Sequence, residues 1–119
     1  MKTIRFLFAV ALLAAIAINS QAQSATKASG QQKTESFKVW GKCDMCKDRI
    51  EKGLSMEGIT KATWEEKTQL ATVTYDPSKT NIAAMQKKLA SIGHDTEKYK
   101  APDDVYARLP DCCHYDRSK

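Results

Sequence analysis

Strong charge of one sign is missing from this sequence, and so is a second long apolar run. The 119 residues include 19 Lys and Arg against 14 Asp and Glu, with the two signs interspersed. No motif that combines aromatic and basic residues accompanies them, so nothing indicates a nucleic-acid-binding protein. The long apolar run is Phe6–Ile18, and no later stretch is apolar enough to cross a membrane.

The first 22 residues have the order of a secretory signal peptide. Lys2 and Arg5 precede the 13-residue apolar run, and the small residues Ser20 and Ala22 stand at −3 and −1 of a cleavage point. The run is shorter than the roughly 20 residues that span a bilayer. No cysteine stands at the cleavage point, which argues against a lipoprotein signal. We therefore expect residues 1–22 to be removed and the protein to be exported, either to the periplasm or out of the cell.

Residues 23–34 lack large apolar side chains and are predicted to form a flexible linker, because they cannot bury enough surface to offset the entropy of ordering. Residues 35–99 follow, with periodicities that predict alternating strands and helices. The predicted elements are a strand at 35–40, a helix from 44 or 45 to 58, a hairpin at 59–75, a helix from 80 or 81 to 93, and a strand at 94–99.

This order of elements is that of the ferredoxin-like fold. We expect an α+β sandwich in which a four-stranded antiparallel sheet carries both helices on one face. The loop at 41–46 and the loop before the last strand would then emerge at the same end of the sheet. The fold would therefore bring Cys43, Cys46 and His94 into one neighbourhood, although the histidine lies about fifty residues further along the chain.

Cys43 and Cys46 form a Cys-x-x-Cys pair where a loop enters a predicted helix. Unpaired backbone N–H groups and the helix dipole favour thiolate at such a place. Thiolate is the form that binds soft metals. Two thiolates suit the near-linear coordination of Cu(I) or Hg(II), whereas tetrahedral Zn(II) needs two further ligands.

The same pair is also compatible with a redox couple or a structural disulfide, and an exported chain permits both. A disulfide that closes so short a loop adds little stability. A thioredoxin-like redox domain needs more secondary-structure elements than this chain supplies. We favour the metal site.

The sequence resembles the heavy-metal-associated domain. The resemblance lies in the order of strand, Cys-x-x-Cys loop, helix, hairpin, second helix and closing "IGHDTEKY". That domain occurs in copper chaperones, metal-pumping P-type ATPases and periplasmic mercuric-ion-binding proteins. The resemblance covers residues 35–99. It implies one soft ion bound by Cys43 and Cys46 and passed on by ligand exchange. The family's methionine beneath the loop is missing, and Trp40 is expected to fill that space.

His94 stands in the closing loop, where we interpret it either as a third ligand or gate beside the metal, or as an exposed histidine without a role. Residues 100–119 are a C-terminal extension outside the resemblance. It ends in "DCCHY", which adds Cys112, Cys113 and His114. We expect these three residues to form a second metal site or to supply additional ligands that fold over the first site; alternatively, Cys112 and Cys113 make disulfides to Cys43 and Cys46, or the cluster has neither role.

The sequence therefore predicts an exported, monomeric heavy-metal-binding protein that acts as a carrier or scavenger of a soft ion. Cu(I) is the expected ion, with Hg(II) and Zn(II) as alternatives. Its expected partner is a metal transporter or acceptor protein, and no catalytic turnover is expected. The rival hypothesis is a small thiol–disulfide oxidoreductase that uses the same cysteine pair.

Overall fold

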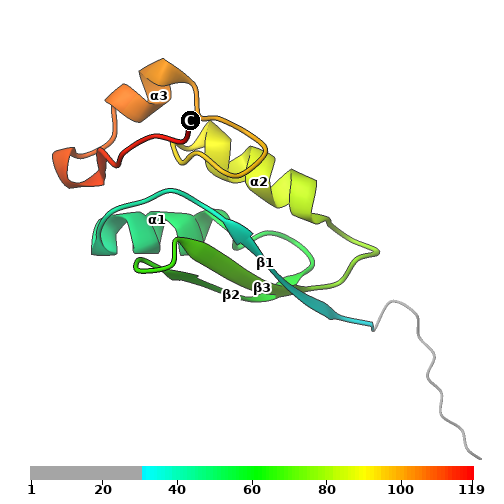
Figure 1. Ribbon diagram of the computed structural model, residues 1–119. Coiled ribbons are helices and arrows are strands. Elements are labelled where there is room, and N and C mark those ends of the chain that lie inside the picture. Colours follow the sequence, from blue (N-terminus) through cyan, green and yellow to red (C-terminus); the bar gives the residue numbers. More distant parts are fainter. Residues whose placement is uncertain (1–30) are drawn as a thin grey trace, which may run out of the picture.

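The computed structural model describes residues 31–119, so the predicted signal peptide and residues 23–30 of the predicted linker lie outside the described residues. Within this range, three strands form one antiparallel sheet in the order β1-β3-β2 (Figure 1). They are β1 (Lys33–Lys38), β2 (Ile59–Glu65) and β3 (Leu70–Tyr75). The β2–β3 hairpin lies where the sequence predicts it, and β1 begins two residues earlier than expected.

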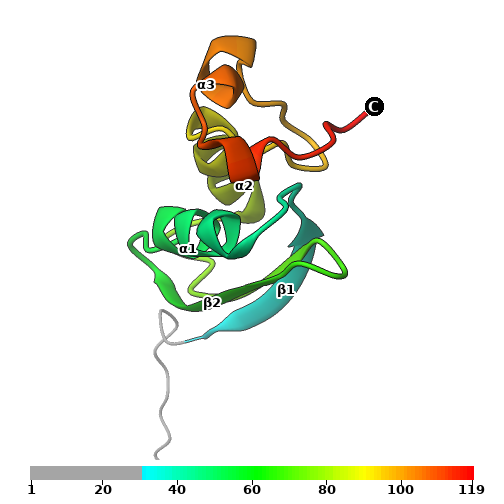
Figure 2. The ribbon, with the colours of Figure 1, turned by 90° about the vertical axis from the view of Figure 1, so that its left-hand side faces the viewer.

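Two helices, α1 (Asp44–Gly53) and α2 (Ile82–Ser91), cover the same face of the sheet (Figures 1 and 2). The buried face of α1 follows the four-residue spacing of Cys46, Ile50 and Leu54, all of which are fully buried. α2 begins where the side chain of Asn81 accepts a hydrogen bond from the backbone N–H of Ala84 at 2.8 Å. These elements give the small α+β architecture that the sequence predicts.

The predicted fourth strand at 94–99 is not formed, so the expectation of a four-stranded sheet is wrong. In the described residues, this segment meets the sheet through a single antiparallel bridge between Val39 and Thr96. Directly after the bridge the chain turns back, because the N–H of Thr96 donates to the carbonyl of Tyr99 at 2.7 Å. A strand needs consecutive residues that pair with its neighbour, and this turn prevents it.

Residues 100–119, here called the C-terminal segment, form a second layer over the helices. The segment contains α3 (Asp103–Ala107) and a single 3-10 turn, η3 (Asp111–Cys113), which lies directly above α1 in Figure 2. Leu109, Cys113 and Tyr115 are buried in the same core as the sheet and the helices. In the described part of the chain, no helix has the length and apolar character that a bilayer span requires.

Candidate metal centre

Cys43 and Cys46 lie where the first loop enters α1. Cys43 is the extended residue just before the helix, and Cys46 lies in the first turn. Their Sγ atoms are 3.7 Å apart. Cys46 is fully buried and Cys43 is half-buried. The start of the helix therefore offers one accessible and one inaccessible sulfur, close enough to bind the same ion.

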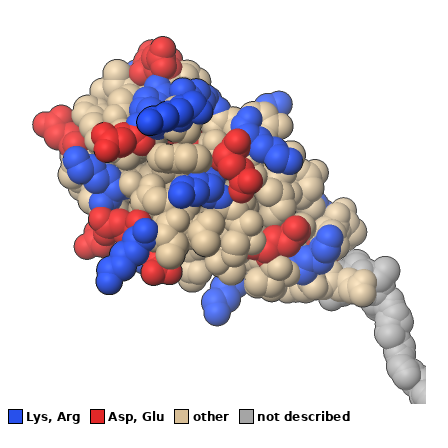
Figure 3. Space-filling view, in the orientation of Figure 1, with Lys and Arg blue, Asp and Glu red and all other residues tan. Residues whose placement is uncertain are grey.

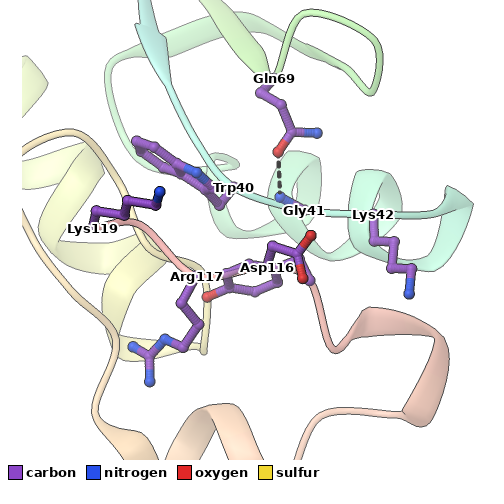
Figure 4. A pocket seen from close by; sticks show the side chains of 8 residues that line it. Trp40, Gly41, Lys42, Gln69, Asp116, Arg117 and Lys119 are labelled. Carbon is purple, nitrogen blue, oxygen red and sulfur yellow. Dashed lines mark hydrogen bonds between the residues drawn. The ribbon is translucent and has the colours of Figure 1, made fainter.

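The loop before the cysteine pair is held by Gln69 and Trp64. The N–H of Gly41 donates to Oε1 of Gln69 at 2.9 Å (Figure 4). The indole N–H of Trp64 donates to the carbonyl of Val39 at 3.0 Å. A Cβ on Gly41 would lie 2.8 Å from the Trp64 ring, so a larger residue does not fit unless the ring moves.

Trp64 is thus the support beneath the loop that the sequence analysis did not identify. The tryptophan expected there, Trp40, is only partly buried, with Lys38 Nζ 5.5 Å from its ring. The signal that points to Trp64 is its place on the inward face of β2, opposite Ala71 of β3. A buried tryptophan usually also needs a hydrogen-bond partner, and here the carbonyl of Val39 supplies it.

The C-terminal segment brings two more thiols to the cysteine pair. From the Sγ of Cys43, the Sγ of Cys112 is 3.1 Å away and that of Cys113 is 3.7 Å away. The Sγ atoms of Cys112 and Cys113 are 4.0 Å apart. These three thiols form a group of potential metal ligands that lie within 4.8 Å of one another. These three cysteines and Cys46 together are called the sulfur cluster below.

Two further observations describe the sulfur cluster. All four of its cysteines are free thiols. The thioether sulfur of Met45, an exposed residue of α1, lies 3.3 Å from the Sγ of Cys112. The structure thus places the thiols of Cys112 and Cys113 next to the first pair.

Asp95 holds the C-terminal segment in this position. Its side chain is fully buried and pairs with Arg117, with Nη2–Oδ1 and Nε–Oδ2 distances of 2.7 and 3.1 Å. The carboxylate also accepts the backbone N–H groups of Ala101 at 2.8 Å and Ser118 at 3.1 Å. Burial alone would raise the pKa of Asp95, but these hydrogen bonds outweigh it and hold the pKa below its usual range.

Tyr115 and Leu109 attach the C-terminal segment to the loop at Gly93. The hydroxyl of Tyr115 donates to the carbonyl of Gly93 at 2.6 Å and accepts the N–H of Asp95 at 2.8 Å. Gly93 has a φ of 111°, and a Cβ there would lie 2.8 Å from the side chain of Leu109. Only glycine adopts this conformation without strain while leaving room for the leucine.

In the described residues, the group of potential metal ligands includes neither His94 nor His114. His94 is fully buried, and its Nδ1 lies 2.9 Å from the carbonyl of Trp40. A carbonyl can only accept, so Nδ1 carries the proton. Burial lowers the pKa of His94, which keeps the ring neutral. The ring stacks on Tyr115, with centroids 5.5 Å apart, and its Nε2 is buried without a hydrogen-bond partner.

His114 follows the two cysteines of η3 but turns its ring toward Tyr106, with centroids 5.2 Å apart. Its Nε2 is also buried without a hydrogen-bond partner. Both histidines thus pack against tyrosine rings of the C-terminal segment.

Cys43 ionises more readily than either C-terminal thiol of the cluster, because its pKa is lowered and theirs are raised. Burial opposes its ionisation, but hydrogen bonds with Cys112, Cys46 and Cys113 outweigh burial and lower the pKa of Cys43 to about 7. The hydrogen bond to Cys43 raises the pKa of Cys112. Burial, followed by contacts with Cys46 and Cys43, raises the pKa of Cys113. Among Cys43, Cys112 and Cys113, negative charge in the metal-free protein therefore resides first on Cys43.

This distribution of charge predicts how the reduced, metal-free protein reacts with iodoacetamide. Only thiolate reacts, so the rate at Cys43 is expected to reach half its maximum at about pH 7. In Cys112→Ala the hydrogen-bonding group beside Cys43 is lost without replacement, and the midpoint should move to higher pH. Mass spectrometry of the peptide that begins at Cys43, fragmented to separate this residue from Cys46, gives the rate. A midpoint at the ordinary thiol pKa of about 8.5 in the parent would contradict the prediction.

Two lysines of α1 are paired with acidic residues of the same helix. Lys47 contacts Glu51 and donates to the carbonyl of Trp64 at 3.0 Å, and Lys52 pairs with Asp48 at 2.9 Å. On the face shown in Figure 3, basic and acidic side chains are interspersed rather than gathered by sign. No patch of one charge stands out on this face. The ligands that decide which ion fits this region are therefore the sulfur atoms, and sulfur donors fit a soft metal ion.

Comparison with known proteins shows which family this arrangement belongs to. The model of the heavy-metal-associated domain matches residues 42–95, which include both cysteines of the Cys-x-x-Cys pair. The copper-exporting P-type ATPase of Bacillus subtilis is 39% identical over 77 residues, which are 63% of this chain and 10% of that protein. The chain thus spans about a tenth of the length of this curated relative.

Two solved structures are similar over about half of the chain. The CopZ metallochaperone has a TM-score of 0.52 at 29% identity, over 54% of this chain and 98% of its own. The N-terminal domain of a potential copper-translocating P-type ATPase from Bacillus subtilis, in the Cu(I)-loaded state, has a TM-score of 0.53 at 25% identity, over 56% of this chain and 85% of its own. The C-terminal segment lies beyond the residues that the family model matches. Residues 42–95 of this chain belong to the heavy-metal-associated domain family.

Proposed function

We propose that this protein is an exported binding protein for a soft metal ion, in the first place Cu(I), and that it acts as a non-enzymatic carrier or scavenger. Cys43 and Cys46 are its primary ligands. The order of residues 1–22 supports export through a cleaved signal peptide. The names of its relatives, a copper-exporting ATPase and a metallochaperone, support copper as the ion and a transporter or other metal-binding protein as the partner.

The observation that carries the proposal is the position of the two sulfurs at the start of α1. With metal–sulfur bonds of about 2.3 Å, two thiolates on opposite sides of one ion stand at most about 4.6 Å apart. The Sγ atoms of Cys43 and Cys46 are 3.7 Å apart, within that limit. Cys43 is partly accessible, so an ion can enter and leave by exchange of ligands.

Titration with Cu(I) under anaerobic conditions, in competition with the chelator bicinchoninate, tests the proposal. We expect one tightly held ion per chain in the reduced parent protein, and loss of this binding in the double variant Cys43→Ser/Cys46→Ser. Circular dichroism shows whether the variant is folded. Equal binding by parent and variant would refute the assignment of these ligands. Parallel titrations with Hg(II) and Zn(II) rank the alternative ions.

The rival hypothesis, a thiol–disulfide oxidoreductase, draws support from the lowered pKa of Cys43 and the 3.1 Å distance between its Sγ and that of Cys112. An oxidoreductase must turn over a disulfide substrate without metal. Incubation of the metal-free protein with a disulfide-bonded test protein and a thiol reductant separates the two functions. We expect no acceleration beyond that given by the reductant alone.

A further inference from the structure

We propose that Cys112 and Cys113 of the C-terminal segment bind the same ion as Cys43, so that the protein holds its metal in a covered site of at least three thiolates. The C-terminal segment then retains the ion and slows its transfer. This inference rests on the proposed function, since it concerns the same ion. It favours a scavenger over a rapidly exchanging carrier.

The distances among the sulfurs carry the first step. With metal–sulfur bonds of about 2.3 Å, ligands of one ion stand about 4.0 Å apart in a trigonal plane and about 3.8 Å apart in a tetrahedron. The three separations among Cys43, Cys112 and Cys113 are 3.1, 3.7 and 4.0 Å. A movement of less than about 1 Å at the exposed side chain of Cys112 would complete a trigonal site.

The environment of the sulfurs carries the second step. Cys113 is fully buried, although it lies close to the end of the sequence, and it contacts the thiols of both Cys43 and Cys46. Its place in the core makes it part of the folded site rather than a freely moving side chain. Cys46, whose Sγ is 3.7 Å from that of Cys43 but lies outside the group of three thiols within 4.8 Å of one another, is the candidate for a fourth ligand.

The attachment of the C-terminal segment carries the third step. Just beyond the cysteines, Tyr115 binds the loop at Gly93, and Arg117 binds the buried carboxylate of Asp95. These contacts do not involve sulfur, so they hold Cys112 and Cys113 over the site before an ion arrives. Ligands that are already in place bind with a smaller loss of conformational entropy.

Such a site affects release more than capture. Transfer of a thiolate-bound ion to an acceptor requires an incoming ligand to reach the metal. Thiolates of η3 would occupy that approach, and the segment would have to move away first. When the site fills, each thiol that binds as thiolate gives up its proton, and no electron is transferred.

The number of sulfur ligands is the direct test. With one equivalent of Cu(I), X-ray absorption of the full chain should show three or four sulfurs per copper in the parent and two in Cys112→Ser/Cys113→Ser. Because the tethered thiols act as an added chelate arm, the double variant should bind Cu(I) on the order of 10²-fold more weakly. Cys112→Ser alone changes an exposed residue, so it tests the inference even if the substitution of buried Cys113 disturbs folding.

A second pair of variants tests the attachment without touching sulfur. Arg117→Met removes the partner of buried Asp95, whereas Arg108→Met removes an equally basic residue from an exposed ion pair of α3, with Asp104. Removal of a residue that positions metal ligands typically costs about 10–100-fold in affinity. We expect such a loss in Arg117→Met and no change in Arg108→Met. In the metal-free state, Arg117→Met should also expose the C-terminal segment to faster hydrogen exchange.

The possible failures are distinguishable. Two sulfurs per copper in the parent, with equal affinity in the Cys112→Ser variant, would overturn this inference and leave the proposed function intact. A parent that binds no Cu(I), or a Cys43→Ser/Cys46→Ser variant that binds as well as the parent, would overturn the proposed function itself.

Discussion

Asp95→Ala is expected to lower the free energy of unfolding by about 3–5 kcal/mol, because it removes the buried carboxylate of an ion pair and leaves Arg117 with the fully exposed Asp103 as its remaining ionic partner. The side chain of Asp95 is fully buried, and that of Arg117 is 21% exposed. The variant also leaves the backbone N–H groups of Ala101 and Ser118 without their acceptor. Each lost partner adds a desolvation cost that is not recovered elsewhere.

Urea denaturation measures the effect, and Asp104→Ala provides the matched control. Asp104 also pairs with an arginine, Arg108, but both side chains are more than two-thirds exposed, at 71% and 73%. Removing that pair should change the free energy of unfolding by less than about 1 kcal/mol. Similar effects of the two substitutions would mean that Asp95 does not hold the C-terminal segment.

The pH dependence of the same difference follows from the lowered pKa of Asp95. A carboxylate whose pKa is lower in the folded than in the unfolded chain stabilises the fold above its unfolded pKa, about 3.9 for aspartate. The difference in stability between parent and Asp95→Ala should therefore be complete above about pH 5 and shrink as the pH falls further. A difference that is the same in strong acid would contradict this assignment.

Trp64→Ala is expected to cost about 3–5 kcal/mol, because it removes a large side chain from the core and leaves a cavity. The ring is 2% exposed, and its N–H is the donor to the carbonyl of Val39. The loss reaches the site because the ring also lies against Gly41 in the loop before Cys43. We therefore expect weaker Cu(I) binding as well as lower stability.

Trp40→Ala is the matched control for this prediction. Trp40 is only partly buried, so the same change should cost about 1 kcal/mol. Chemical denaturation of the two variants, followed by circular dichroism, gives the comparison. Equal losses would show that Trp64 has no special place beneath the loop.

The sequence predicts well those elements whose residues repeat at a regular local spacing. The inward residues of β3 alternate, and those of α1 recur every four positions, so both elements and the place of Cys43 and Cys46 at a helix start follow from spacing alone. The resemblance to the heavy-metal-associated domain follows from the order of these elements around the cysteine pair, and the family model confirms it for residues 42–95.

What the sequence does not predict depends on contacts between distant residues. The segment 94–99 has the composition of a strand, but Asp95 turns toward Arg117, 22 positions away, and the chain folds back after one bridge. Nothing in the local pattern marks these two residues as partners. The packing of Leu109 against Gly93 also joins residues that are distant in the sequence. Without knowledge of this contact, the position of the C-terminal cysteines cannot be predicted.

The cysteines that approach each other most closely, Cys43 and Cys112, are 69 positions apart in the chain. An ion bound to both closes nearly the whole domain into one loop, and loop closure restricts the unfolded chain as a disulfide does. Because only the folded chain brings these sulfurs together, the bound ion adds directly to the free energy of unfolding. Degradation of such a protein slows when metal is plentiful. Its abundance would then follow the supply of metal even at a constant rate of synthesis.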